Sequence, residues 1–204
     1  MNAADIYHAK VRELIDGGGS LDDTYEIASE VLRDYVADAE TTLNVLGSLP
    51  RADRQALFRE LVVEGCFWDG ADYWPVVGAL WTDTESPGKY SEHWREVFAA
   101  EFLDREGPGR TAMMSLEELA ALVELPKVVT VYRGFDREGG AEGFSWTLDR
   151  ERAGWFARRF PGDAPSVATG TVARNDIIAV FFGREEAEVV ALPEDVTVIA
   201  VEPL

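Results

Sequence analysis

The feature that most constrains the fold is a change of periodicity near Pro126. Before this residue, apolar side chains recur at the three- and four-residue spacing of helices, and after it β-branched and aromatic residues form short runs between turn residues. Helices followed by strands, rather than alternating with them, predict an α+β fold. We expect a helical segment over residues 1–125 and a β-rich core over 126–204, which together form one domain.

The helical segment contains four runs with helical spacing. Their apolar residues lie within 25–39, which should end before Gly47, within 57–62 and within 94–103, and the fourth run begins at Ser115. Glu118 stands three residues after Ser115, as in a capping box. Residues 67–84 contain three tryptophans around Pro75, and their pattern favours neither a helix nor a strand.

The β-rich core contains six runs typical of strands and one helical run. The strands are expected over 128–132, 144–147, 167–172, 177–182, 187–192 and 196–201, with a helix over 149–160.

Composition excludes several classes of function. The chain has 38 acidic and 19 basic residues, a net charge of -19, so non-specific electrostatic binding to nucleic acid or to an anionic membrane is excluded. One cysteine and two histidines exclude a zinc site built from Cys and His, and we expect no metal. We find neither an apolar run of roughly 18 residues nor a signal peptide, which predicts a soluble cytoplasmic protein.

The acidic residues are unevenly distributed. Residues 1–125 hold 25 acidic and 10 basic side chains, a net charge of -15, whereas residues 126–204 hold 13 and 9, a net charge of -4. The β-rich core can therefore tolerate an anionic ligand.

Arg133 ends the first predicted strand and shares a face with Val129 and Val131. A guanidinium on an apolar face needs an anion, which can be an internal carboxylate or a bound carboxylate or phosphate. The pattern alone leaves both open.

Two further segments carry polar groups. Ser145-Trp146-Thr147 precedes the predicted helix and can simply cap it. Glu186 and Glu188 would project on the same side of a strand over 186–190, about 7 Å apart. Two carboxylates this close repel each other, and a solvated edge strand is the alternative.

The order of these residues resembles a known family. Arg133, then Ser145 in Ser-Trp-Thr, then Glu186-Ala187-Glu188 resembles the Arg–Ser-x-Ser/Thr–Glu-x-Glu pattern of mono-ADP-ribosyltransferases of the arginine-serine-glutamate class. The resemblance covers about residues 127–204. It implies amino-terminal helices packed on a carboxy-terminal split β-sandwich, with NAD bound between two small sheets.

The resemblance also implies roles for these residues. Arg133 would contact a phosphate or ribose of NAD, and Ser145 and Thr147 would hold the catalytic glutamate and the cofactor. Glu188 would bind the nicotinamide ribose and stabilise its positive charge. Glu186 would orient or deprotonate the acceptor.

An aromatic side chain would stack on nicotinamide. The candidates are Phe181 or its neighbour Phe182, Tyr132 and Trp146, and strand alternation does not choose between them.

The implied function is transfer of ADP-ribose from NAD to a protein arginine with release of nicotinamide, as in a toxin or effector. Its partners would be NAD, a target protein and an inhibitor or immunity protein. Two alternatives stay open. One is an NAD glycohydrolase or an inactive binding module of the same fold, and the other is an acidic interaction protein that mimics nucleic acid.

Overall fold

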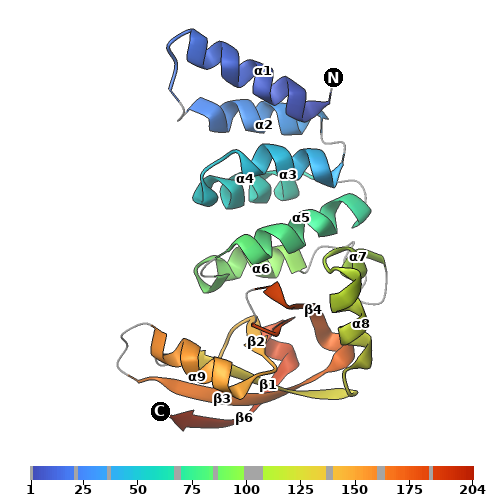
Figure 1. The fold of residues 1–204 in the computed structure, drawn as a ribbon, viewed down its shortest axis with the longest axis vertical. Helices are drawn as coiled ribbons and strands as arrows, with labels where there is room; N and C mark the ends of the chain where they lie inside the picture. Colours follow the sequence, from blue (N-terminus) through green and yellow to red (C-terminus); the bar gives the residue numbers. More distant parts are fainter. Residues whose placement is uncertain are drawn as a thin grey trace. The chain divides into compact units, whose positions relative to one another are not determined.

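A computed structural model describes residues 2–20, 23–35, 38–66, 70–84, 87–98, 108–136, 140–159, 164–183 and 186–204. The chain divides into two compact units, Met1–Thr84 and Glu85–Leu204 (Figure 1). The first unit is helical and the second combines helices with a sheet, so the α+β class is confirmed. The boundary between the units follows Thr84, whereas the change of periodicity lies near Pro126.

The first unit is built from helices, and each helix packs on helices one or two positions away along the chain. α1 packs on α2 and α3, α2 packs on α4, and α3 packs on α5. Asn2 caps α1 and Asp38 caps α3 through side-chain oxygens that accept backbone N–H groups. The helices are α1 (Ala3–Asp16), α2 (Thr24–Tyr35), α3 (Ala39–Gly47), α4 (Arg51–Val63) and α5 (Gly70–Asp83).

Two features of this unit differ from the sequence prediction. The expected helix over 25–39 ends at Tyr35, and a new helix begins at Ala39 because Asp38 accepts from the backbone of Thr41. The unassigned stretch 67–84 contains α5, which includes Pro75. Its aromatic side chains are buried, so core packing outweighs the backbone hydrogen bond that proline cannot make.

The helices of the second unit flank a sheet. The predicted capping box is present, since Ser115 and Glu118 exchange hydrogen bonds between side chain and backbone. The end of the predicted run 94–103 lies outside the described residues. None of the described helices has the length and apolar character needed to cross a membrane. The helices are α6 (Ser91–Phe98), α7 (Pro108–Ala112), α8 (Leu116–Glu124) and α9 (Arg150–Arg159).

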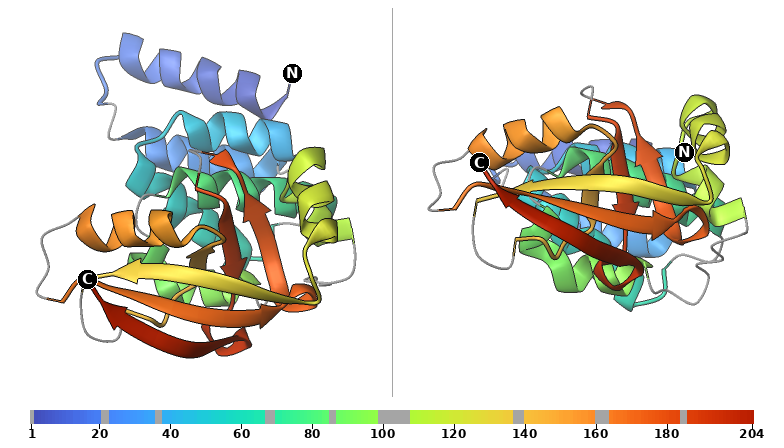
Figure 2. Two further views of the ribbon diagram at one scale, coloured as in Figure 1. Left: turned by 60° about the horizontal axis from the view of Figure 1, so that its bottom comes forward. Right: turned by 90° about the horizontal axis from the view of Figure 1, so that it is seen from below.

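The described strands of the second unit form a six-stranded sheet in the order β4-β5-β2-β1-β3-β6, with antiparallel pairing throughout (Figure 2). Each lies where the sequence predicts a strand. The strands are β1 (Val128–Phe135), β2 (Ser145–Thr147), β3 (Ser166–Ala173), β4 (Ile177–Phe181), β5 (Glu188–Ala191) and β6 (Val196–Pro203).

The sheet has a narrow junction in its middle. β1 pairs with β3 along its whole length, whereas β1 and β2 are in register only at Tyr132 and Thr147. The junction separates β4-β5-β2 from β1-β3-β6, so residues on β1 and β2 belong to different halves of the sheet.

α9 packs against β1 at Gly134. A Cβ atom on this glycine would lie 1.8 Å from the carbonyl oxygen of Ala153, which no side chain can accommodate. Ala153 and Ala157 are fully buried at this contact. The close approach of helix and strand thus depends on small residues on both elements.

Candidate functional site

Four of the residues singled out in the sequence lie in one row across the sheet. Phe181 is opposite Glu188, Glu188 is opposite Thr147, and Thr147 is opposite Tyr132. Directly opposite residues of antiparallel strands project from the same face. The row therefore brings side chains from β4, β5, β2 and β1 to one face of the sheet.

Ser145 joins this face, because it lies two residues before Thr147 on β2. Its hydroxyl donates a hydrogen bond of 2.5 Å to Oε1 of Glu188. Glu188 is only 9 % exposed although it is a glutamate, so its carboxylate needs donors within the protein. A hydrogen bond to a carboxylate is of the stronger, charge-assisted kind.

Arg133 holds the segment that leads into β2. Its Nε donates to the carbonyl oxygen of Gly140 at 2.8 Å, and its Nη1 donates to that of Ser145 at 2.6 Å. Gly143 lets the backbone pass over the guanidinium, since a Cβ atom there would lie 2.5 Å from Cζ. Arg133, Ser145 and Glu188 are thus connected by consecutive hydrogen bonds across the junction of the sheet.

The prediction that Glu186 and Glu188 lie side by side on one strand is wrong. β5 begins at Glu188, and Ala187 has a φ of 43°, in the left-handed region. This conformation breaks the alternation of a strand, so Glu186 belongs to the segment that enters β5. The Glu188 carboxylate therefore belongs to β5, whereas the Glu186 carboxylate belongs to the segment before the strand.

Thr147 fixes that segment through the main chain. Its hydroxyl donates to the carbonyl oxygen of Glu186 at 2.7 Å and accepts from the backbone N–H of Asp149 at 3.1 Å. The N–H of Leu148 also donates to the carbonyl oxygen of Ala187 at 3.1 Å. The described contacts of Thr147 thus hold the backbone next to Glu188 and the start of α9.

The candidate aromatic residues differ in accessibility. Trp146 is 3 % exposed, its Nε1 donates to the carbonyl oxygen of Gly143, and its ring lies against Gly170 of β3. Phe181 is also buried. Tyr132 is partly exposed and Phe182 is 36 % exposed. Tyr132 is therefore the accessible aromatic side chain of the row.

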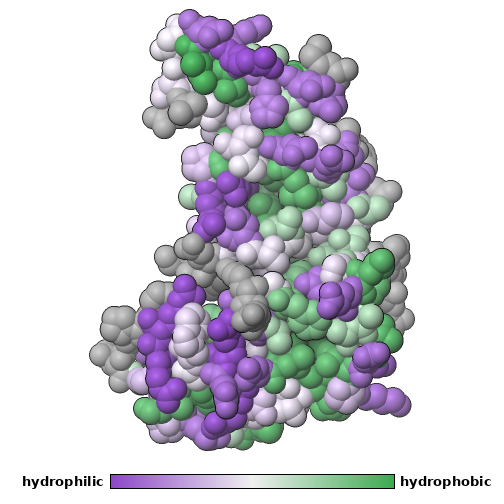
Figure 3. Space-filling view, in the orientation of Figure 1, coloured by the Kyte–Doolittle hydropathy of each residue, from purple (hydrophilic) through white to green (hydrophobic). Residues whose placement is uncertain are grey.

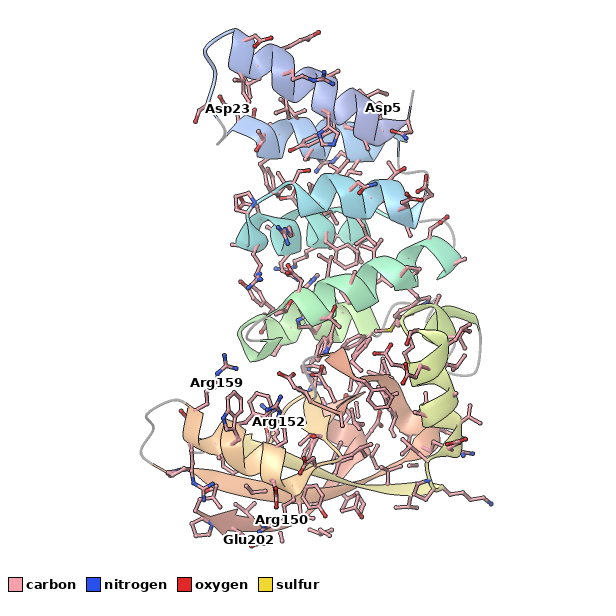
Figure 4. All side chains as sticks on the ribbon, in the orientation of Figure 1. Asp5, Asp23, Arg150, Arg152, Arg159 and Glu202 are labelled. Carbon is pink, nitrogen blue, oxygen red and sulfur yellow. The ribbon has the colours of Figure 1, made fainter. Side chains whose placement is uncertain are left out.

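Arginines of α9 add positive charge to the unit (Figure 4). Arg150 forms an ion pair of 2.7 Å with Glu202 of β6. The guanidinium groups of Arg152 and Arg159 lie 5.0 and 5.1 Å from the ring centre of Trp155, which is 47 % exposed. Arg150 therefore pairs with an exposed carboxylate, whereas Arg152 and Arg159 contact an aromatic ring.

Several parts of the arrangement have weak sequence signals. Glu118, singled out as a capping residue, also accepts the backbone N–H of Phe182 at 3.0 Å and so connects α8 to the end of β4. Gly134, which packs against α9, and Gly143, which packs against Arg133, belong to no sequence motif. Only their positions in or beside strands indicate close packing. Among the described residues, no group of three or more His, Cys, Asp or Glu could hold a metal ion.

No family model matches the chain, and neither a curated protein nor a solved structure is significantly similar to it.

Proposed function

We propose that the chain is an NAD-dependent mono-ADP-ribosyltransferase of the arginine-serine-glutamate class that modifies a protein arginine. One observation carries the proposal. Arg133, Ser145 and Glu188, the residues of the motif, are joined by consecutive hydrogen bonds although they come from three different strands. The contacts of Arg133 with backbone carbonyls also hold β2, so the hydrogen bond between Ser145 and the buried Glu188 is the part of this connection that points to a site.

The sheet supports the proposal at the level of the fold. Among the described strands, Tyr132 and Thr147 are the one register pair between its two halves, as expected if the fold is a split β-sandwich with NAD bound at the split. The motif lies at this junction, with Arg133 on one half and Ser145 and Glu188 on the other.

Glu188 would perform the central electrostatic task. Its carboxylate would stabilise the positive charge that develops on the ribose as the bond to nicotinamide breaks, and nicotinamide leaves as a neutral molecule with the bonding electron pair. This step requires no general acid. Ser145 would keep the carboxylate in place, so that little reorganisation is needed during the reaction.

Glu186 would act on the acceptor. It would accept the proton that the acceptor guanidinium loses when its nitrogen bonds to the ribose carbon. Thr147 holds the main chain of Glu186, so the acceptor carboxylate would be positioned independently of Glu188. Arg133 projects from the face of β1 opposite to Tyr132, so it would contact a phosphate or ribose of NAD from that side while its contacts with Gly140 and Ser145 hold β2. Tyr132 would be the residue that stacks on nicotinamide.

The test uses the full chain, NAD labelled in its adenylate part, and either cell lysate or free arginine as acceptor. The wild type should release nicotinamide and label protein. Glu188→Gln should lower both rates by roughly 100- to 1000-fold, the effect of removing one transition-state contact. Glu186→Gln should preserve nicotinamide release and lose transfer. Glu202→Gln, an exposed glutamate of β6, serves as the matched control and should change neither rate.

Three outcomes would contradict the proposal. Nicotinamide release without labelled protein or labelled arginine would indicate an NAD glycohydrolase. A folded wild type that releases no nicotinamide would indicate an inactive module. Salt-sensitive binding to a basic protein that Glu188→Gln leaves unchanged, without release, would indicate the acidic interaction protein.

A further inference from the structure

α8 presents apolar side chains on the side that faces solvent. Leu116 is 87 % exposed and Val123 is 64 % exposed, and the exposed Ala120 lies between them on the same face. The opposite side of the helix is anchored, because Leu122 is buried. Figure 3 shows apolar surface gathered over the region that α8 occupies in Figure 1. We call Leu116, Ala120 and Val123 the α8 stripe.

The α8 stripe has an acidic border. Glu117 and Glu124, both exposed, are two turns apart and lie along one side of the stripe at 3.6 residues per turn. The complement of this surface is an apolar stripe bordered by basic side chains. A second copy of the chain fits poorly, because it would bring two acidic borders and two net charges of -19 together.

The size of the α8 stripe suits a helix. From Leu116 to Val123 the stripe runs about 10 Å along the axis, at 1.5 Å per residue, and this equals two helical turns. Apolar residues at positions i, i+4 and i+7 match the spacing with which an amphipathic helix presents its own anchors. Exposed apolar surface with a charged border is typical of a protein-binding site.

α8 is connected to the segment that carries the proposed site. Glu118 accepts the backbone N–H of Phe182, and the backbone N–H of Val180 contacts the sulfur of Met114 just before the helix. Phe181, between these two residues, lies opposite Glu188. The helix with the stripe is thus bonded to the strand next to Glu188.

We propose that the α8 stripe binds an amphipathic, basic helix of the acceptor protein and so brings an arginine to Glu186 and Glu188. This inference rests on the proposed function for the identity of the partner as an acceptor. The α8 stripe is defined by exposure and charge alone. Binding of a helix to the stripe can therefore be tested separately from the proposed function.

The first experiment measures binding without NAD. A fluorescent helical peptide with leucines at i, i+4 and i+7 and lysines beside them is titrated with the full chain. The controls are the same residues in scrambled order and a peptide with glutamates in place of lysines. We expect only the lysine peptide to bind. Leu116→Ser combined with Val123→Ser should weaken binding at least 10-fold, and Glu117→Lys with Glu124→Lys should weaken it and abolish its salt dependence.

Ile199→Ser is the matched control, because Ile199 is 61 % exposed on β6 and lies outside the α8 stripe. It should leave peptide binding unchanged. Equal binding of the glutamate peptide, or equal loss with Ile199→Ser, would overturn the inference. So would a dimer of the wild type that the Leu116 and Val123 variant dissociates, because the occupant would then be a second copy.

The second experiment measures transfer. The Leu116→Ser and Val123→Ser variant should label lysate proteins at least 10-fold more slowly than the wild type, while labelling free arginine and releasing nicotinamide at the wild-type rate. Unchanged labelling of lysate proteins would overturn the inference and leave the proposed function intact. If the wild type does not cleave NAD, the proposed function fails, the acceptor role falls with it, and peptide binding alone decides whether the α8 stripe is a docking surface.

Discussion

Ser145 and Glu188 lie diagonally across β2 and β5, and the serine hydroxyl donates to the glutamate carboxylate at 2.5 Å. Both side chains project from the face of the sheet that carries Thr147 and Tyr132. The buried carboxylate of Glu188 is therefore oriented by the neighbouring strand β2, through the side chain of Ser145.

If the proposed function holds, Ser145→Ala should reduce nicotinamide release by roughly 10- to 100-fold through kcat, with a small change in KM, because a mispositioned carboxylate stabilises the transition state less well. The free energy of unfolding should fall by only about 1–2 kcal/mol. Ser145→Thr keeps the hydroxyl and should retain more activity than Ser145→Ala. Initial-rate kinetics and urea unfolding measure the two effects, and equal activity of the two variants would argue against the hydroxyl.

Arg133→Lys should loosen the start of β2. A lysine cannot reach two carbonyl groups with the fixed fork of a guanidinium, so we expect a loss of about 1–3 kcal/mol in the stability of this region. Hydrogen exchange of the backbone amides in β2 measures the loss. Arg150→Lys is the control, because its ion pair with Glu202 is half exposed and contributes less than about 1 kcal/mol. Equal protection of β2 in both variants would contradict the positioning role of Arg133.

Gly134→Ala should destabilise the second unit by more than about 3 kcal/mol, since its Cβ atom would collide with the carbonyl oxygen of Ala153 and force α9 away from β1. Gly183→Ala is the matched control. No atom lies within 4 Å of a Cβ atom at that position, so the change should be neutral or slightly stabilising. Urea unfolding of the two variants tests this, and similar midpoints would show that α9 can move without cost.

Alkaline pH should destabilise the first unit through Tyr25. Burial and the hydrogen bond that its hydroxyl donates to Glu60 at 2.8 Å raise the pKa of Tyr25 to about 12. An unfolded tyrosine has a pKa of about 10, so this contribution to stability is complete below pH 10 and is lost as the pH rises towards 12.

Tyr25→Phe should flatten the dependence of stability on pH between about 10 and 12. Thermal unfolding of the wild type and of Tyr25→Phe across this range measures it. Burial also raises the pKa of Tyr73, so a residual decline should persist in the Tyr25 variant. An unaltered slope in Tyr25→Phe would contradict the assignment.

The strands could be predicted well because each apolar run is bounded by turn residues and is short. α5 could not, since Pro75 and a cluster of aromatic residues obscure helical spacing, and only burial in the unit explains why the helix forms. The break at Asp38 was also missed, because apolar spacing continues through a position where a side-chain cap starts a new helix.

The residues of the candidate site could be singled out from the sequence, whereas their arrangement could be predicted only in part. The row from Phe181 to Tyr132 follows from strand register, which depends on the pairing of distant segments. The contacts of Arg133 depend on the path of the loop through Gly140 and Gly143. The left-handed conformation of Ala187 has no sequence signal, because alanine rarely adopts it.

The conformation of Ala187 has a consequence for how the chain can vary. Strand side chains alternate, so a one-residue insertion or deletion between Glu188 and Val190 would turn the glutamate to the opposite face and remove it from the row. A length change before Ala187 leaves the register of β5 untouched. Engineered variation in length should therefore be tolerated before Glu186 and should disrupt the row between Glu188 and Val190.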